Sequence, residues 1–339
     1  MYSCSASAAL VRRLAVFTLS LAIINSAIAN PDEWREEWPN TDFSRSTIAF
    51  AEILSGGPPR DGIPALTHPR FENANANRAL PATEPVIVVV DGASARAYPL
   101  RILMWHEIVN DVINGRPIAV TYCPLCNASI VYDRRAARDN GKIVLSFGVS
   151  GKLRHSDMVM FDRETESWWQ QFTGNAIVGS MTGYSLRRIR SETLPYAEFV
   201  ARHPDGLVLA EPDDQQRRYG FNPYERYDGL RWPFLYTGRY AEATPPLAYV
   251  VVVGRDAWPL EMVRKSGRIR HGDIQIEWSK GMNSALDAPV IAESRELGFV
   301  VVRRIAGREK PLPYDVTFAF AFKAFMPTGT IHQAPPALN

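Results

Sequence analysis

The sequence contains little cysteine, and this scarcity limits the sites that it can build. Its three cysteines are Cys4, Cys123 and Cys126. Cys4 precedes an apolar run that is typical of an export signal, so we expect only Cys123 and Cys126 in the mature chain. A zinc site with four thiolate ligands is therefore excluded. Any metal held by these two cysteines must take further ligands from histidine, methionine or carboxylate side chains.

Motifs of several enzyme classes are also absent. The sequence has no His-Glu-x-x-His pair of zinc ligands and no glycine-rich dinucleotide fingerprint. The glycine-containing segment 148–152 has the spacing of neither a phosphate-binding loop nor a nucleophile elbow. Whether the chain is an enzyme therefore stays open at this stage.

The chain has no excess of positive charge once the predicted export signal is removed. Without Arg12 and Arg13, the 38 Lys and Arg residues fall to 36, which equals the 36 Asp and Glu residues. The remaining arginine pairs, such as Arg187-Arg188, lie in alternating patterns that are typical of solvated strand faces. No clustered basic stripe is present, so we expect no nucleic-acid partner.

The first 29 residues predict a cleaved signal peptide. Arg12-Arg13 precede the apolar run Leu14–Ile24, and Ala27-Ile28-Ala29 matches the small-x-small cleavage pattern. The apolar run is short for a membrane span, and no stop-transfer segment follows it. We expect a periplasmic or secreted protein that is cut near Ala29 and has no transmembrane segment afterwards.

Many short apolar runs separated by 25 prolines and 22 glycines favour a β-rich α+β fold. We expect antiparallel sheets or a partly open barrel with a few short helices. The run Val86–Val90 predicts a strand, Asp91-Gly92 a hairpin turn, and Ala95–Tyr98 a return strand. An amphipathic helix is predicted from Pro99 to Asn114-Gly115. His106 lies at the edge of its apolar face.

A short internal similarity predicts two related β-rich units. Residues 88–100 contain a run of valines, a turn and the sequence Ala-Tyr-Pro-Leu. The same pattern recurs in residues 251–260, where the last four residues are Ala-Trp-Pro-Leu. A helix is predicted over Thr317–Phe325. We expect a signal peptide over residues 1–29 and an N-terminal arm over 30–84. A first unit with the cysteines follows over 85–210, then an irregular insertion over 211–247, and a second unit with a C-terminal helix over 248–339.

Cys123 and Cys126 flank Pro124-Leu125 directly after a β-type run. Two thiols at this spacing can form a disulfide, bind a metal, or cycle between dithiol and disulfide. An exported location favours the disulfide by default. For a metal, the candidate further ligands are His106, His155, Met158 and Met160, and thiolate with imidazole and thioether suits copper. For redox chemistry, Cys123 would attack, Cys126 would resolve, and His106 would act as the nearby base.

Four ordered motifs resemble one protein family. They are Arg60–Pro64, His106–Asp111, Thr121–Cys126 and Ser156–Trp169, and the similarity extends from about Asp61 to the phenylalanine-rich C-terminal segment. The chain is similar to the bacterial domain of unknown function three-one-seven-nine, whose members are exported or membrane-associated. The resemblance names no reaction. It implies that one constellation contains Asp61, His106, Glu107, Asp111, Cys123, Cys126, Ser156 and Asp157.

Two functions of different classes remain after the sequence is considered. The first is a thiol-based site that binds a soft metal such as copper or carries out thiol–disulfide exchange. The second is a non-catalytic module that binds a glycan, a peptide, a small ligand or an envelope protein. In that module Trp105, Tyr122 and Trp168 would line a groove, and the cysteines would form a structural disulfide.

Overall fold

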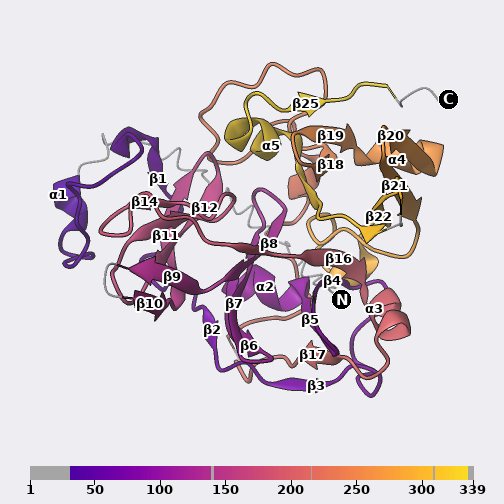
Figure 1. Ribbon diagram of the computed structural model, residues 1–339, viewed down its shortest axis with the longest axis horizontal. Helices are drawn as coiled ribbons and strands as arrows, with labels where there is room; N and C mark the ends of the chain where they lie inside the picture. The colour runs from indigo at the N-terminus through magenta and orange to yellow at the C-terminus, as the bar shows by residue number, and fades with distance from the viewer. Residues whose placement is uncertain (1–30, 139–140, 215, 308–309, 335–339) are drawn as a thin grey trace, which may run out of the picture.

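The computed structural model describes residues 31–138, 141–214, 216–307 and 310–334. The predicted signal peptide lies outside these residues. The described chain forms six sheets, most of them antiparallel, joined by short helices (Figure 1). The β-rich α+β fold that the sequence predicts is therefore confirmed. No helix of the described residues is long and apolar enough to cross a membrane.

Two five-stranded sheets form the scaffold of the first unit. The first consists, in spatial order, of β16 (Ser191–Pro195), β4 (Pro85–Asp91), β5 (Ser94–Pro99), β17 (Leu207–Leu209) and β3 (Phe71–Asn73). The second consists of β15 (Arg188–Ile189), β8 (Ala128–Asp133), β7 (Arg116–Cys123), β6 (Ile108–Ile113) and β2 (Leu66–Thr67). The predicted hairpin is the β4–β5 pair, in which Val88 pairs with Ala97.

Two four-stranded sheets in residues 249–331 repeat this arrangement. One consists of β24 (Asp315–Phe318), β18 (Tyr249–Val253), β19 (Asp256–Pro259) and β25 (Thr330–Ile331). The other consists of β20 (Arg268–His271), β21 (Ile274–Ser279), β22 (Phe299–Arg304) and β23 (Lys310–Pro311). In each unit, the strand that comes last in the chain within the first sheet pairs in parallel with the second strand of the hairpin. These parallel pairs are β17 with β5 and β25 with β19. The short sequence similarity thus corresponds to a shared strand order.

A further five-stranded sheet lies at the left of Figure 1, and four of its strands come between β8 and β15 in the chain. Its strands are β1 (Ile53–Ser55), β11 (Phe147–Arg154), β12 (Asp157–Asp162), β13 (Trp168–Gln170) and β14 (Ala176–Val178). A two-stranded sheet of β9 (Arg135–Arg138) and β10 (Gly141–Val144) precedes it in the chain. The N-terminal arm packs here, where Trp38 contacts Trp168 edge-on at 5.4 Å.

All described helices are short. The α-helices are α1 (Pro31–Trp34), α2 (Leu100–His106), α3 (Tyr196–Arg202), α4 (Leu260–Ser266) and α5 (Ala319–Phe325). The 3₁₀ helices are η1 (Phe50–Glu52), η2 (Tyr227–Gly229) and η3 (Ile291–Glu293). The insertion that contains η2 has no strand in its described residues, in keeping with its irregular sequence.

The long helix predicted from Pro99 to Asn114-Gly115 is wrong in its second half. The helix α2 ends at His106, because Glu107 takes a left-handed conformation with φ 56°. The following residues form β6, and Asn114-Gly115 is the tight turn into β7, with both φ angles positive. The predicted helix over Thr317–Phe325 likewise begins later, at Ala319, because β24 extends to Phe318. The apolar residues of Thr317–Phe325 fit a helical and a strand period alike. Strand β6 is buried on both faces, so its apolar residues lack the alternation that would have indicated a strand.

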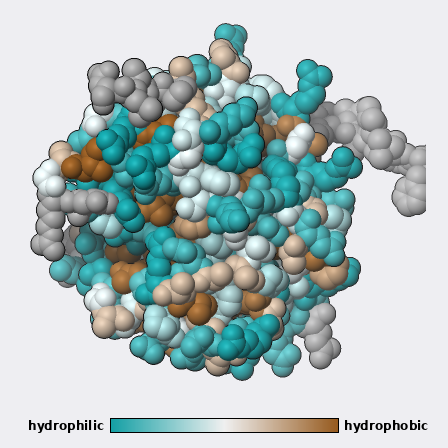
Figure 2. All heavy atoms as spheres, turned by 90° about the vertical axis from the view of Figure 1, so that its right-hand side faces the viewer, coloured by the Kyte–Doolittle hydropathy of each residue, from teal (hydrophilic) through white to brown (hydrophobic). Residues whose placement is uncertain are grey.

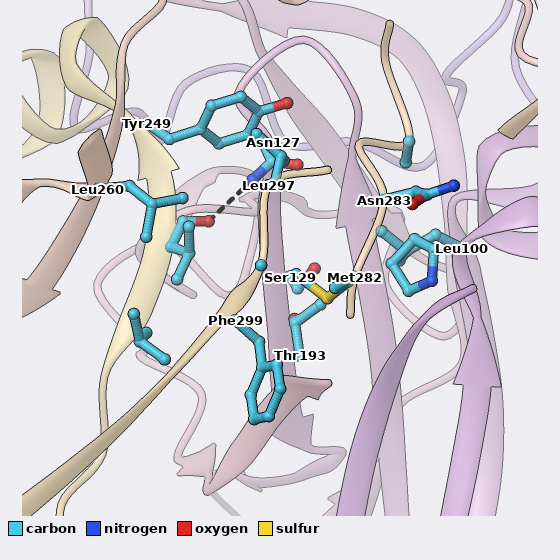
Figure 3. A pocket seen from close by; sticks show the side chains of 15 residues that line it. Leu100, Asn127, Ser129, Thr193, Tyr249, Leu260, Met282, Asn283, Leu297 and Phe299 are labelled. Atoms are coloured by element: carbon cyan, nitrogen blue, oxygen red, sulfur yellow. Dashed lines mark hydrogen bonds between the residues drawn. The ribbon is translucent and has the colours of Figure 1, made fainter. Parts of the chain in front are cut away.

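The two units share one core. Buried residues from both, including Tyr122, Cys126, Tyr249 and Phe318, belong to a single hydrophobic cluster. Figure 3 shows the seam between the units, where a small cavity of about 30 Å³ lies beside Asn127, Tyr249 and Leu260. That volume holds about one water molecule. The outer face on the second unit's side is largely hydrophilic, with scattered hydrophobic side chains (Figure 2).

Candidate functional site

The two cysteines lie at the tip of the β7–β8 hairpin. Cys123 is the last residue of β7 and pairs with Ala128, which closes the hairpin. Cys126 lies in the connecting turn, and its backbone N–H donates to the Cys123 carbonyl at 3.3 Å. Asn127 completes the turn with φ 48°, a conformation that asparagine tolerates better than most residues. The turn therefore places both sulfur atoms on one side of the hairpin tip.

A strand of the second unit forms hydrogen bonds with this turn. The carbonyl oxygen of Cys126 accepts hydrogen bonds from the Phe318 N–H at 3.0 Å and the Thr317 hydroxyl at 2.7 Å. The Asn127 side-chain amide donates to the Val316 carbonyl at 3.0 Å (Figure 3). All three partners belong to β24. The position of the cysteine turn thus depends on a strand almost two hundred residues later in the chain.

Asp157 completes a group of three buried ligand atoms. A tight turn at His155 and Ser156, both with positive φ, carries the chain from β11 into β12, which begins at Asp157. The sulfurs of Cys123 and Cys126 and a carboxylate oxygen of Asp157 all lie within 4.8 Å of one another. The Ser156 carbonyl oxygen lies 3.5 Å from the Cys126 sulfur.

One carboxylate oxygen of Asp157 is satisfied and the other is not. Oδ2 accepts hydrogen bonds from the Gln170 side chain at 2.6 Å and the Phe172 N–H at 2.9 Å. Oδ1 is buried and has no hydrogen-bond partner in the described residues. Such an atom is costly in a protein interior, and it is typical of a site that receives an ion, a proton or a ligand. Burial raises the pKa of Asp157 to about 7.

The cysteines are free thiols and do not form the disulfide that the exported setting favours. Burial raises the pKa of Cys123, and it raises the pKa of Cys126 well above its ordinary value. Glu107 is a further buried acid, and burial together with the charge of Asp157 raises its pKa to about 8. Within the described parts of the chain, neither carboxylate forms an ion pair. The site therefore holds four acidic groups, and no described cationic side chain forms an ion pair with them.

An apolar pocket of about 320 Å³ borders this group. Glu107, Leu125 and Met158 line its inner side, and the irregular insertion covers it with Tyr224, Tyr227, Phe234 and Leu235. Two hydrogen bonds fix this cover: the Tyr227 hydroxyl donates to the Leu125 carbonyl at 2.9 Å, and the Ser156 hydroxyl donates to the Phe234 carbonyl at 2.5 Å. The pocket is large enough for a small organic molecule.

The predicted histidine ligands are engaged elsewhere. The Nδ1 of His106 lies 2.8 Å from the Pro64 carbonyl, and its Nε2 lies 2.7 Å from the Tyr219 hydroxyl. Burial lowers the pKa of His106. His155 lies 3.4 Å from the Glu52 carboxylate and contacts the Phe325 ring. Neither histidine belongs to the ligand group with the two cysteines.

The constellation implied by the family resemblance therefore divides. Ser156, Asp157 and Glu107 lie at or beside the cysteines. Met158, predicted separately as a metal ligand, lines the adjoining pocket. Asp61 instead pairs with Arg163 through two contacts of 2.7 and 2.9 Å. Asp111 accepts a hydrogen bond from Tyr98 at 2.6 Å and pairs with Arg96. These last two carboxylates stabilise the surrounding structure.

The groove expected for a binding module is not formed by the predicted residues. Tyr122 and Trp168 are fully buried, and Trp168 packs among aromatic residues of the N-terminal arm. The pocket is instead lined by tyrosines of the insertion, which sequence reasoning missed. Their segment has no periodicity, so only its aromatic content could have drawn attention to it.

One family model matches most of the chain. Residues 60–329 match the family described as "Protein of unknown function (DUF3179)", which covers more than half of the chain. The chain belongs to this family. No curated protein and no solved structure matches the chain. The family match spans both units, the cysteine turn and the insertion that covers the pocket.

Proposed function

We propose that this family member is an exported metal-binding protein that holds one cation between Cys123, Cys126 and Asp157. The observation that carries the proposal is the convergence of three buried ligand atoms within 4.8 Å, one of them on a carboxylate with an unsatisfied oxygen. A cation would complete the hydrogen-bonding and charge requirements of that carboxylate. It would also stabilise two thiolates that burial otherwise disfavours.

The donor set favours a soft or borderline cation. Thiolate sulfur selects Cu(I) and Zn²⁺ over Mg²⁺ and Ca²⁺. A mixed set of two sulfurs and one oxygen matches Zn²⁺ best, because zinc accepts thiolate and carboxylate together. Copper(I) would rely on the sulfurs alone. Three protein ligands leave one position of a tetrahedral zinc site open, as in catalytic zinc sites. The adjoining pocket would admit a small ligand to that position.

The proposal is tested by titrating metal-free, reduced protein with Co²⁺, Zn²⁺ and Cu(I). We expect one equivalent at this site and, with Co²⁺, an absorption band from thiolate-to-metal charge transfer. Cys123→Ser and Cys126→Ser should abolish the band, and Asp157→Asn should weaken binding. His155→Gln is the matched control and should bind normally. Full binding in both cysteine variants would refute the metal site.

A second function, thiol–disulfide exchange, is supported by Cys123 and Cys126 being free thiols. Cys123 and Cys126 could donate two electrons to a disulfide substrate, becoming a disulfide while the substrate becomes two thiols. The unpartnered Oδ1 of Asp157 could take the proton of the attacking thiol. Because both sulfurs are buried, only a substrate that enters the pocket could react. Equilibration with glutathione buffers distinguishes the two functions: a pair that stays reduced throughout excludes exchange, whereas reversible oxidation without metal uptake favours it.

A further inference from the structure

A second group of ligand side chains lies in the second unit, far along the chain from the cysteines. Asp256, His271 and His332 each offer one ligand atom, and these atoms all lie within 4.8 Å of one another. All three side chains are partly exposed, so an ion from solvent can reach them. They are the one other such group among the described residues.

Three different elements deliver these residues to one place. Asp256 is the first residue of β19, and His271 is the last residue of β20. His332 directly follows β25, which pairs in parallel with β19, and its backbone N–H donates to the Ala257 carbonyl at 2.9 Å. β19 and β25 belong to one sheet of the second unit, whereas β20 belongs to the other. The group therefore bridges the two sheets.

The two imidazoles are held in place by aromatic stacking. The ring of Trp258 stacks on His332 with 5.0 Å between ring centroids and 9° between planes. Trp258 also contacts His271 at 5.4 Å, and the two histidine rings lie 4.8 Å apart. The Nε2 of His332 lies 2.8 Å from the Asp256 carboxylate, a separation that neighbouring ligands of one metal ion can adopt. No hydrogen bond from the His271 ring is found in the described residues, so both of its nitrogens remain free to bind a metal.

The equivalent positions of the first unit carry no such group. Asp256 pairs with Val253 and Thr330, and its counterpart Arg96 pairs with Val89 and Leu207. By the same strand pairing, His271 corresponds to Ile113 and His332 to Leu209. An arginine and two aliphatic residues satisfy the fold at these positions. The strand scaffold therefore does not require two histidines and a carboxylate there.

We infer that Asp256, His271 and His332 form a second metal site, specific for borderline divalent cations such as Zn²⁺, Ni²⁺ and Cu²⁺. Imidazole with one carboxylate suits these ions, whereas Mg²⁺ and Ca²⁺ prefer sites made of oxygen alone. A bound ion would link the two sheets of the second unit and fix the segment after β25. Because it binds only the folded state, it would also raise the thermal midpoint of unfolding.

The test separates this site from the cysteine site by spectroscopy and by substitution. The full-length mature chain is prepared with Cys123→Ala and Cys126→Ala and titrated with Cu²⁺ and Zn²⁺. Electron paramagnetic resonance reports nitrogen ligands to Cu²⁺, and calorimetry gives the Zn²⁺ affinity. We expect one equivalent with nitrogen hyperfine coupling and a Zn²⁺-dependent rise in the thermal midpoint. The unsubstituted chain, titrated in parallel, shows that this binding does not depend on removing the thiols.

Single substitutions then identify the ligands. His271→Gln and Asp256→Asn should each weaken Zn²⁺ binding at least tenfold, because even the loss of an outer partner of a ligand costs about 10- to 100-fold. His203→Gln, a histidine of the first unit outside any such group, is the control. Circular dichroism of the metal-free variants shows whether each one folds. The ring of His271 has no hydrogen bond in the described part of the chain, so it can be replaced with little effect on the fold. Unchanged affinity in a folded His271→Gln variant, or no nitrogen coupling to Cu²⁺, would overturn the assignment.

Discussion

Corresponding strand connections of the two units each lie against a buried carboxylate, and the two carboxylates are satisfied in opposite ways. In the second unit, the connection between β21 and β22 brings Arg295 against the buried Asp228, with contacts of 2.7 and 2.9 Å. In the first unit, the corresponding connection is the short cysteine turn, which brings two thiols against Asp157. Asp228 therefore has its counter-charge within the protein. Asp157 has none.

This difference separates a structural carboxylate from the one that we propose to bind a cation. Asp228 also accepts hydrogen bonds from the hydroxyl groups of Tyr249 at 2.8 Å and Ser284 at 2.6 Å, so its charge is matched and its oxygens are occupied. The Asp157 site keeps an unsatisfied oxygen, with Glu107 as a second acid nearby. A protein interior tolerates such a group at a cost in stability, which a bound cation would offset.

The largest expected effect is the pH dependence of the metal-free protein. The pKa is raised by folding to about 7 for Asp157 and to about 8 for Glu107. The folded state therefore binds more protons than the unfolded state between about pH 4 and pH 8, so stability falls as the pH rises through this window. We expect a loss on the order of 4 kcal/mol from each of the two acids. Urea unfolding across this pH range measures it.

Glu107→Gln should flatten that profile, because it removes one of the two titrating acids. Glu225→Gln, at an exposed position of the insertion, should keep the wild-type profile. Added Zn²⁺ should restore stability near pH 8. A metal-free protein that becomes more stable from pH 5 to pH 8 would contradict the contrast between the two carboxylates.

The next largest effect concerns the satisfied carboxylate. Asp228→Ala leaves the buried hydroxyl groups of Tyr249 and Ser284 without their acceptor and Arg295 without its main partner, so it should lower the free energy of unfolding by about 3 kcal/mol. Asp287→Ala is the control, because Asp287 also pairs with Arg295 but is partly exposed. It should cost about 1 kcal/mol or less. Equal losses in the two variants would show that burial is not what distinguishes these carboxylates.

A smaller effect is expected at the seam between the units. Thr317→Val removes the hydroxyl that donates to the Cys126 carbonyl and preserves the shape of the side chain. The loss should be about 1 kcal/mol, because the Phe318 N–H still satisfies that carbonyl. Thr193→Val, in the related strand β16, is the control. Hydrogen exchange of the cysteine-turn amides should accelerate only in the Thr317 variant; an unchanged exchange rate would show that β24 does not hold the turn.

The smallest expected effect is on the metal affinity of His106→Gln. The two ring nitrogens of His106 contact Pro64 and Tyr219 rather than the cysteines, so the substitution should leave Zn²⁺ binding at the cysteine site unchanged. Calorimetric titration measures this directly. A marked loss of affinity in a folded variant would return His106 to the ligand set that the sequence suggested.

Sequence reasoning identified the cysteine turn and its strands because these depend on local signals. The valine run, the Asp91-Gly92 turn and the proline between the cysteines predict strand and turn from neighbouring residues. It failed at Glu107, because the apolar spacing after this residue continues the helical pattern although a single left-handed residue ends the helix and a strand buried on both faces follows. It proposed His106 as a ligand because closeness along the chain suggested closeness in space.

By itself, therefore, the sequence determined the β-rich class, the similarity between the two units and the cysteine pair, all of which follow from short-range patterns. Only the tertiary structure decided which third ligand meets those sulfurs, because Asp157 reaches them through a turn of another sheet. It also decided that the insertion covers the pocket and that His332 joins Asp256 and His271. These contacts join residues far apart in the chain, and local propensity carries no information about which distant segments pack together.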